Sequence, residues 1–287
     1  MASMREIKRR KASIESTGQI TQAMKLVSTA KLQRAKGRVE TSKPYFQYMY
    51  EAVTSILAKS GNINHPYLQA GASKKKAFIV VTSNRGLAGG YNNNVVKLLT
   101  KGDIPKEDIV VYAVGRKGRD ALHRYGYEIK EDYSEVMNDP LFSDAATIGR
   151  AVLDAFSNDE VGEIYLAYTV FKNTITQVPT LTKLLPVASA EEKEEAKSAE
   201  DLVLMNYEPE AEEALDQIIP RYVNSLIYGG LIESVASENG ARMQAMDSAS
   251  NNAEEMIADL SLKYNRARQA SITQELTEIV AGASAIE

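Results

Sequence analysis

The sequence predicts an α/β protein in which two long terminal helices flank a central α/β domain. Three observations lead to this expectation. All eight prolines lie between Pro44 and Pro220, so both ends of the chain can form long helices and the middle cannot. Short apolar runs alternate with helical patterns between residues 74 and 186. A heptad repeat of small and apolar residues follows Gly240, which is typical of a coiled coil.

The N-terminal segment, residues 1–60, is rich in good helix formers such as Ala, Lys, Gln and Met. Its predicted apolar face, spaced by three and four residues, consists of Ile20, Ala23, Met24, Val27 and Ala30. The pattern resumes after Pro44 with Tyr45, Met49, Val53, Ile56 and Leu57. We therefore expect one helix that continues past a kink at Pro44, with Gly18 as a candidate interruption.

The C-terminal segment, residues 211–287, is more regular. Nine residues follow one another at alternating spacings of three and four: Met243, Met246, Ser250, Ala253, Ile257, Leu260, Tyr264, Ala267 and Ser271. Because these residues are small or flexible, the seam allows close approach of a second helix but drives association weakly. From Arg221 onward 67 residues lack proline, which as one helix would reach roughly 100 Å and predicts a rod. Gly240 beside Asn239 is a candidate hinge in it.

The middle of the chain, residues 74–186, predicts a three-layer α/β domain. Three short apolar runs rich in β-branched residues are typical of buried parallel strands, at residues 77–81, 109–114 and 164–168. Helical patterns lie between them, at residues 94–99, 117–125 and 145–156. An acidic stretch from Glu191 to Asp216, with a net charge of −9, follows and predicts an exposed linker over residues 187–210.

Composition excludes several kinds of chemistry. The chain has no Cys and only two His, which excludes disulfides, thiolate metal sites and cysteine nucleophiles and makes a histidine-rich zinc site implausible. No apolar run approaches the roughly 20 residues needed to cross a bilayer, and the first residues are too charged for a signal peptide. We therefore expect a soluble, intracellular protein without a metal or a cofactor.

No catalytic constellation is evident. A Gly-rich turn after the first predicted strand, residues 83–92, matches neither of the common phosphate-binding templates, so the pattern favours tight turns in an α/β domain over phosphate binding. The same holds for residues 115–118. Paired glutamates such as Glu191 and Glu192 have no neighbouring histidine or nucleophile, so they indicate solvated surfaces rather than acid–base catalysis.

Charge is distributed unevenly, although the net charge of the whole chain is only −4. Residues 1–43 carry a net charge of +8. A basic helix of this kind is consistent with a solvated helix face, with an acidic protein partner or with nucleic acid. The acidic total of the chain argues against nucleic acid, and the residues alone leave the three alternatives open.

The chain resembles the γ subunit of F-type ATP synthases from end to end. The most specific match is the stretch ITQELTEIVAGA at residues 272–283. Three further stretches agree with the family pattern: QITQAMKLV at 19–27, VPT with LLP at 178–186, and ARMQAM followed by Asn252 and Ala253 at 241–253.

The resemblance implies an antiparallel coiled coil of the terminal helices beside a Rossmann-like domain. It also implies a function as the central rotor shaft, which couples proton-driven rotation of the c ring to ATP synthesis at the β sites. The implied partners are the α and β subunits, the ε subunit and the c ring. The chain would be a non-catalytic subunit without a cofactor, peripheral to the cytoplasmic face of a bacterial membrane.

Carried over from the family, contacts with the β subunits would fall on seven residues: Met24, Lys25, Arg242, Gln244, Gln269, Thr273 and Glu275. Contact with the c ring would fall on Tyr207 and Glu208. Two other functions compete with this interpretation. One is a dinucleotide-binding enzyme with a helical oligomerisation arm, and the other is a coiled-coil scaffold that docks on nucleic acid.

Overall fold

Two long helices and a five-stranded sheet make up the protein. The computed structural model describes residues 4–59, 65–187 and 211–284. Helix α1 spans Met4–Lys59 and helix α5 spans Ala211–Ser284. Contacts divide the chain into two compact units: residues 1–28 with 242–287, and residues 29–241. The second unit therefore contains the sheet together with the adjoining parts of both long helices.

Both long helices are continuous through every position that was a candidate break. Pro44 lies inside α1 and Pro220 lies inside α5. Gly18 and Gly240 also have helical neighbours on both sides, so neither interrupts its helix. The segment boundaries expected from the sequence stay a prediction, because the division by contacts cuts across both helices.

The sheet has the strand order β3-β2-β1-β4-β5. Its strands are β1 (Lys76–Val81), β2 (Ile109–Val114), β3 (Glu128–Asp132), β4 (Glu163–Phe171) and β5 (Gln177–Leu185). The first four run parallel, and β5 pairs antiparallel with β4. The chain thus builds outward from β1 to β2 and β3, and then returns to the other side of β1 with β4.

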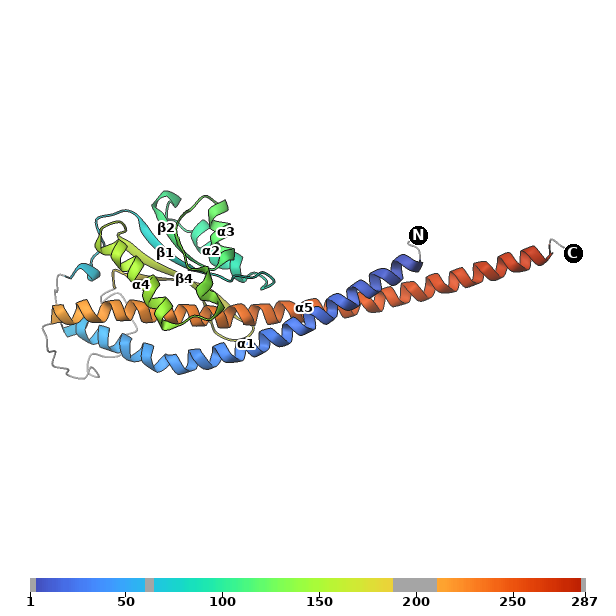
Figure 1. Cartoon of the computed structure of the whole chain (residues 1–287), viewed down its shortest axis with the longest axis horizontal. Coiled ribbons are helices and arrows are strands. Elements are labelled where there is room, and N and C mark those ends of the chain that lie inside the picture. Colours follow the sequence, from blue (N-terminus) through green and yellow to red (C-terminus); the bar gives the residue numbers. More distant parts are fainter. Residues whose placement is uncertain (1–3, 60–64, 188–210, 285–287) are drawn as a thin grey trace. The chain divides into compact units, whose positions relative to one another are not determined.

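Helices cover both faces of this sheet (Figure 1). Helices α2 (Tyr91–Thr100) and α3 (Arg116–Arg124) pack on one face through side chains such as Val95 and Leu122. Helix α4 (Phe142–Ser157) and the first part of α5 pack on the other face. Residues of α5 four apart, Leu215, Ile219, Val223, Ile227 and Leu231, are fully buried there. One row of a single helix therefore supplies much of the core.

The predicted α/β fold is confirmed, including the parallel arrangement of the three predicted strands. Strands β3 and β5, which lie at the two edges of the sheet, were not predicted from the sequence. Edge strands expose part of their surface, so they lack the apolar runs that revealed the central strands. Strand β5 even contains Pro179. Proline cannot donate a ladder hydrogen bond, so within sheets it is largely confined to edge strands.

Gly240 of α5 lies against the end of the β4–β5 hairpin. A Cβ there would lie 3.4 Å from Gln177 and from Phe171, at the end of the β4–β5 hairpin. The Gln177 amide donates a hydrogen bond to the Thr174 carbonyl oxygen at 2.8 Å, which fixes that hairpin end. The hairpin end therefore packs against α5 at Gly240, a contact that the sequence does not reveal.

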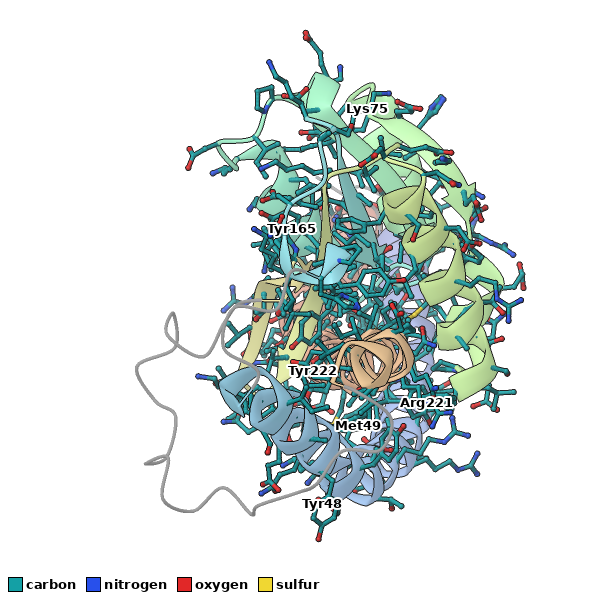
Figure 2. All side chains as sticks on the ribbon, turned by 90° about the vertical axis from the view of Figure 1, so that its left-hand side faces the viewer. Tyr48, Met49, Lys75, Tyr165, Arg221 and Tyr222 are labelled. Atoms are coloured by element: carbon teal, nitrogen blue, oxygen red, sulfur yellow. The ribbon has the colours of Figure 1, made fainter. Side chains whose placement is uncertain are left out.

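Small residues also bring α5 close to its neighbours on both sides. A Cβ on Gly230 would lie 2.8 Å from Leu166 of β4, and one on Gly229 would lie 3.3 Å from Phe46 of α1. Seen along α5, Tyr222 lies on the side of α5 that faces α1, while Tyr48 of α1 points away into solvent (Figure 2). Within this unit α5 is therefore held between the sheet and α1.

The turn after β2 depends on Gly115, whose φ of 115° suits glycine. A Cβ there would overlap the carbonyl oxygen of Thr82, a buried residue that links the ends of β1 and β2. The Thr82 amide donates to the Val114 carbonyl oxygen at 2.7 Å, and the Thr82 hydroxyl accepts from the Gly118 amide at 2.9 Å.

We predict that Gly115→Ala lowers the free energy of unfolding by about 2–3 kcal/mol, because it adds backbone strain to a clash with backbone atoms. Gly37→Ala is the matched control, since Gly37 lies in α1 with nothing within 4 Å of the added Cβ. That change is expected to raise stability by up to about 1 kcal/mol. Urea denaturation of both variants measures the difference, and equal effects would contradict the prediction.

Glu233 of α5 is a half-buried carboxyl group, and its Oε2 has no hydrogen-bond partner within the described residues. Burial raises its pKa, and the opposing effects of the Phe171 amide and the Lys43 ammonium group do not cancel that increase. Tyr168 of β4 also faces it, and both burial and the Glu233 carboxylate raise the pKa of that tyrosine. The pKa of Glu233 is higher in the folded state than in the unfolded state. Its ionisation therefore lowers the free energy of unfolding once the pH rises above the pKa of the unfolded carboxyl group.

We therefore predict that Glu233→Gln raises the free energy of unfolding at pH 7 by about 1 kcal/mol, because an amide keeps the acceptor for Phe171 and removes the buried charge. Near pH 3, where the wild-type carboxyl group is protonated, the gain should vanish. Denaturation at both pH values measures it. Glu254→Gln, at an exposed position of α5, is the control. A Glu233→Gln variant no more stable than wild type at pH 7 would refute the prediction.

Candidate partner-binding site on the paired helices

The first compact unit consists of the start of α1 and the end of α5. The nine residues of the predicted heptad seam on α5, from Met243 to Ser271, are all buried or half-buried. On α1 the less exposed positions also alternate by three and four: Ile7, Lys11, Ile14, Gly18, Thr21, Lys25 and Ser28. The two sets match as the seams of a coiled coil do.

Three contacts define how the seams pair. A Cβ on Gly18 would lie 3.4 Å from Cβ of Ala253. The hydroxyl groups of Thr21 and Ser250 are 2.8 Å apart, and Lys25 Nζ lies 2.6 Å from Asp247 Oδ1. Residue numbers rise on α1 as they fall on α5, so the helices are antiparallel.

The expected apolar face of α1 was wrong in part. Ile20 and Val27 are 58% and 57% exposed, and Ala23 and Ala30 are exposed as well. The buried seam runs instead through Gly18, Thr21 and Ser28. The helices approach closely at this seam, so small residues occupy it. The large apolar residues on which the expectation was based, Ile20 and Val27, lie on the outer face.

The seven residues carried over as β-subunit contacts all lie in this unit. Their burial differs. Gln244, Gln269, Thr273 and Glu275 are exposed, Met24 and Lys25 are half-buried, and Arg242 is buried at 9% exposure. Thr273 donates a hydrogen bond to the Gln269 carbonyl oxygen at 2.9 Å, so these two side chains share one face of α5.

The structure brings these residues into two groups. Met24 and Lys25 lie beside the stretch of α5 that contains Gln244, because Lys25 contacts Asp247. Gln269, Thr273 and Glu275 lie further along α5, beyond Asp247 by about 22 residues or roughly 33 Å of helix. The role of all seven residues stays a prediction. Tyr207 and Glu208 fall outside the described residues.

A surface that the sequence analysis missed lies near the end of α5. By the observed pairing, Met4 of α1 falls opposite about residue 267 of α5. Every described side chain from 268 to 282 is exposed except the half-buried Ser271. Ile272, Leu276 and Ile279 are 48%, 58% and 67% exposed. Exposed apolar side chains on a helix of this length mark a contact surface for another protein.

The described residues hold no group of three or more side chains suited to a metal ion. In an α/β sheet the usual ligand crevice lies at the carboxyl ends of the strands where the order reverses, here β1 and β4. At this place Tyr91 and Thr169 contact α5: Tyr91 Oη donates to the Ser234 carbonyl oxygen at 3.2 Å, and Ser237 Oγ donates to that of Thr169 at 3.0 Å. The protein's own helix therefore occupies this part of the crevice.

The Gly-rich turn after β1 is held by its own side chains. Asn92 Oδ1 accepts a hydrogen bond from the Ser83 amide at 2.9 Å, and Ser83 Oγ donates to the Arg85 carbonyl oxygen at 2.6 Å. These contacts agree with a tight structural turn.

We predict that Lys25→Glu destabilises the helix pair, because it places a carboxylate beside Asp247. The loss should be about 0.5–1 kcal/mol, as for partly exposed ion pairs. The charge-swapped variant Lys25→Glu/Asp247→Lys should recover most of it. Lys31→Glu is the control, because Lys31 is exposed on the same helix and forms no ion pair within the described part of the chain. Thermal melting followed by circular dichroism measures all three, and a swap that melts no higher than Lys25→Glu would refute the pairing.

Comparison with known proteins identifies relatives over the whole length. A family model described as ATP synthase matches residues 3–286. The ATP synthase gamma chain of Lachnoclostridium phytofermentans is 70% identical over 290 aligned positions, covering all of both chains. The sodium-ion-specific gamma chain of Acetobacterium woodii is 45% identical and covers 99% of this chain and 98% of its own length.

Solved structures agree in fold. A chain in the Euglena gracilis mitochondrial ATP synthase, solved with OSCP, F1 and c ring, has a TM-score of 0.70 at 18% identity and covers 99% of this chain and 94% of that one. A chain of the Tetrahymena thermophila mitochondrial ATP synthase central stalk and c ring has a TM-score of 0.60 at 25% identity, with coverages of 80% and 99%. On the full-length match to the family model and to the bacterial relatives, this chain belongs to the ATP synthase gamma chain family.

Proposed function

We propose that this chain is the central rotor shaft of a rotary ATP synthase. It couples rotation of the c ring to sequential conformational change and ATP synthesis at the catalytic β sites, and it has no active site of its own. The proton is the proposed coupling ion, although one relative is described as sodium ion specific.

One observation carries this proposal. Residues 268–282 of α5 extend past the described part of α1 and expose Ile272, Leu276 and Ile279. A lone helix of this length is marginally stable in water, and apolar side chains on it favour burial in a partner. An enclosing ring of α and β subunits provides such a partner.

The antiparallel pair supports the mechanism through its asymmetry. A ring of equivalent sites has the same nucleotide affinity at each site until something distinguishes them. Two different helices at its centre present a different surface to each site, so each site is biased toward a different conformation. Turning the pair exchanges these biases in sequence. Met24, Lys25, Arg242, Gln244, Gln269, Thr273 and Glu275 are the proposed contact residues.

Other partners follow from the position of this shaft in the assembly. The c ring and the ε subunit are also proposed partners, with Tyr207 and Glu208 touching the c ring. The basic first turns of α1, with Arg5, Lys8 and Arg9 exposed, favour an acidic partner surface over nucleic acid in a chain of net charge −4. No helix in the described ranges has the length and apolarity to span a bilayer. We propose peripheral attachment at the cytoplasmic face of a bacterial membrane, through the complex.

We predict that Leu276→Ser weakens assembly with coexpressed α and β subunits about tenfold or more, because burying a leucine side chain contributes about 1.5–3 kcal/mol. Titration of the purified α and β subunits with the variant chain measures the affinity. The melting temperature of the isolated chain should stay unchanged, since Leu276 is exposed.

Leu141→Ser is the matched control. Leu141 is 54% exposed in the sheet domain, close to the 58% of Leu276, and its replacement should leave assembly unchanged. Equal affinities for the two variants would contradict a buried α5 end. ATP hydrolysis by the isolated wild-type chain would contradict the absence of an active site. ATP-driven acidification of vesicles in sodium-free buffer distinguishes proton from sodium coupling.

A further inference from the structure

Strand β4 runs past the end of its neighbour β1. The last paired residues are Val80 of β1 and Ala167 of β4, while β4 continues to Phe171. Backbone groups of β4 beyond Ala167 therefore face α5 where a β1 residue would otherwise pair with them. Buried backbone donors and acceptors need partners, so something must replace the missing strand.

Helix α5 supplies those partners through its side chains. The Thr169 amide donates to Ser234 Oγ at 3.4 Å, and the Thr169 carbonyl oxygen accepts from Ser237 Oγ at 3.0 Å. The Phe171 amide donates to the Glu233 carboxyl group. Tyr91, the first residue of α2, donates from its hydroxyl group to the Ser234 carbonyl oxygen at 3.2 Å. Ser234, Ser237 and Thr169 are buried, so water does not compete for these bonds.

This contact is more polar than a helix–sheet core requires. Four buried side-chain oxygen atoms lack a hydrogen-bond partner within the described residues, and two of them belong to residues of this contact, Thr169 and Glu233. Unpaired buried oxygens lower stability, and apolar residues of similar size would avoid that loss. Apolar packing, however, is not directional, whereas hydrogen bonds at four points fix both the height and the rotation of a helix.

We infer that this contact is a clamp that locks α5 to the α/β domain against sliding and rotation, with Tyr91, Thr169, Ser234 and Ser237 as positioning residues. The inference rests on the proposed function as a rotor. Torque that enters through the domain reaches the end of α5 only if the helix cannot rotate relative to the sheet. The crevice that binds a ligand in other α/β proteins here contacts α5.

The test compares a clamp variant with a variant of a buried serine whose hydroxyl group donates within its own helix. The clamp variant is Tyr91→Phe/Ser234→Ala/Ser237→Ala. The control is Ser225→Ala, because Ser225 is equally buried on α5 and donates to the Tyr222 carbonyl oxygen of its own helix at 2.7 Å. Whole complexes are placed in vesicles, and ions pumped are measured per ATP hydrolysed. We expect this ratio to fall at least twofold in the clamp variant and to equal that of wild type in the control.

A merely structural defect would lower the amount of assembled complex and leave the ratio unchanged, and that result would overturn the inference. The single variant Ser237→Thr retains the hydroxyl group. Its ratio should therefore equal that of wild type, while the ratio of the single variant Ser237→Ala should fall. If the triple variant does not assemble, Ser237→Ala alone decides by the same ratio.

Hydrogen exchange on the full-length isolated chain provides an independent reading. The amide of Thr169, which loses its Ser234 acceptor, should exchange at least tenfold faster in the clamp variant than in Ser225→Ala, while those of β2 stay unchanged. Unchanged exchange at Thr169 would also overturn the inference. Because this measurement needs no partner, it tests the clamp even if the chain fails to assemble with α and β subunits, which would refute the proposed function instead.

Discussion

Close approach of α5 to its neighbours is the constraint on which the rest of the structure depends. Within the sheet-containing unit, Gly229 and Gly230 remove the side chains that would separate α5 from α1 and β4. Within the paired-helix unit, Gly18 lies opposite Ala253, where an added Cβ would reach van der Waals contact at 3.4 Å. At such short separations the backbone and short hydroxyl side chains come within hydrogen-bond reach, so polar contacts such as Thr21 to Ser250 replace the large apolar side chains of an ordinary core. The same device therefore acts in both units, although the partners of α5 differ.

The polar contacts of α5 lower the stability of the fold but fix the position of the helix. Each unpaired buried oxygen along α5, such as those of Asn224 and Glu233, lowers the free energy of unfolding. Large apolar side chains elsewhere in the same unit offset that loss, since Leu215, Ile219 and Val223 are fully buried on one row of the helix. Helix α5 thus divides its surface along its length. Its early turns hold the domain together through non-directional packing, and its later turns within that unit set position through hydrogen bonds.

The sequence predicted the parts of this fold that rest on apolar periodicity. The runs that became β1, β2 and β4 are buried on both faces, and the heptad on α5 keeps one phase from Met243 to Ser271. Both patterns can therefore be recognised in the sequence without knowing which element packs against them. Edge strands β3 and β5 and the true seam of α1 escaped prediction, because their residues are polar or small and owe their burial to a neighbour distant in sequence. The same reason hid the contacts of Thr169 and Gly240 with the rest of the unit. Close approach leaves no local signal, since Gly and Ser are also what a turn or a solvated surface would contain.

The exposed end of α5 continues past a helix pair whose seam is weak. The seam mixes small residues such as Gly18, Ser250 and Ala253 with only a few large apolar ones, so it buries less apolar area per turn than a seam of Leu and Ile, and the helix pair gains less stability from its own interface. Exposed residues such as Ile20 and Val27 could not improve that interface, because they lie on the outer face of α1, and Leu276 lies past the described part of α1. They would instead contribute their burial energy when a partner encloses the pair. On the proposed function, an enclosing partner would stabilise the pair, and the small residues of the seam keep the two helices close together. The apolar outer faces and the small inner ones are therefore two consequences of a single requirement.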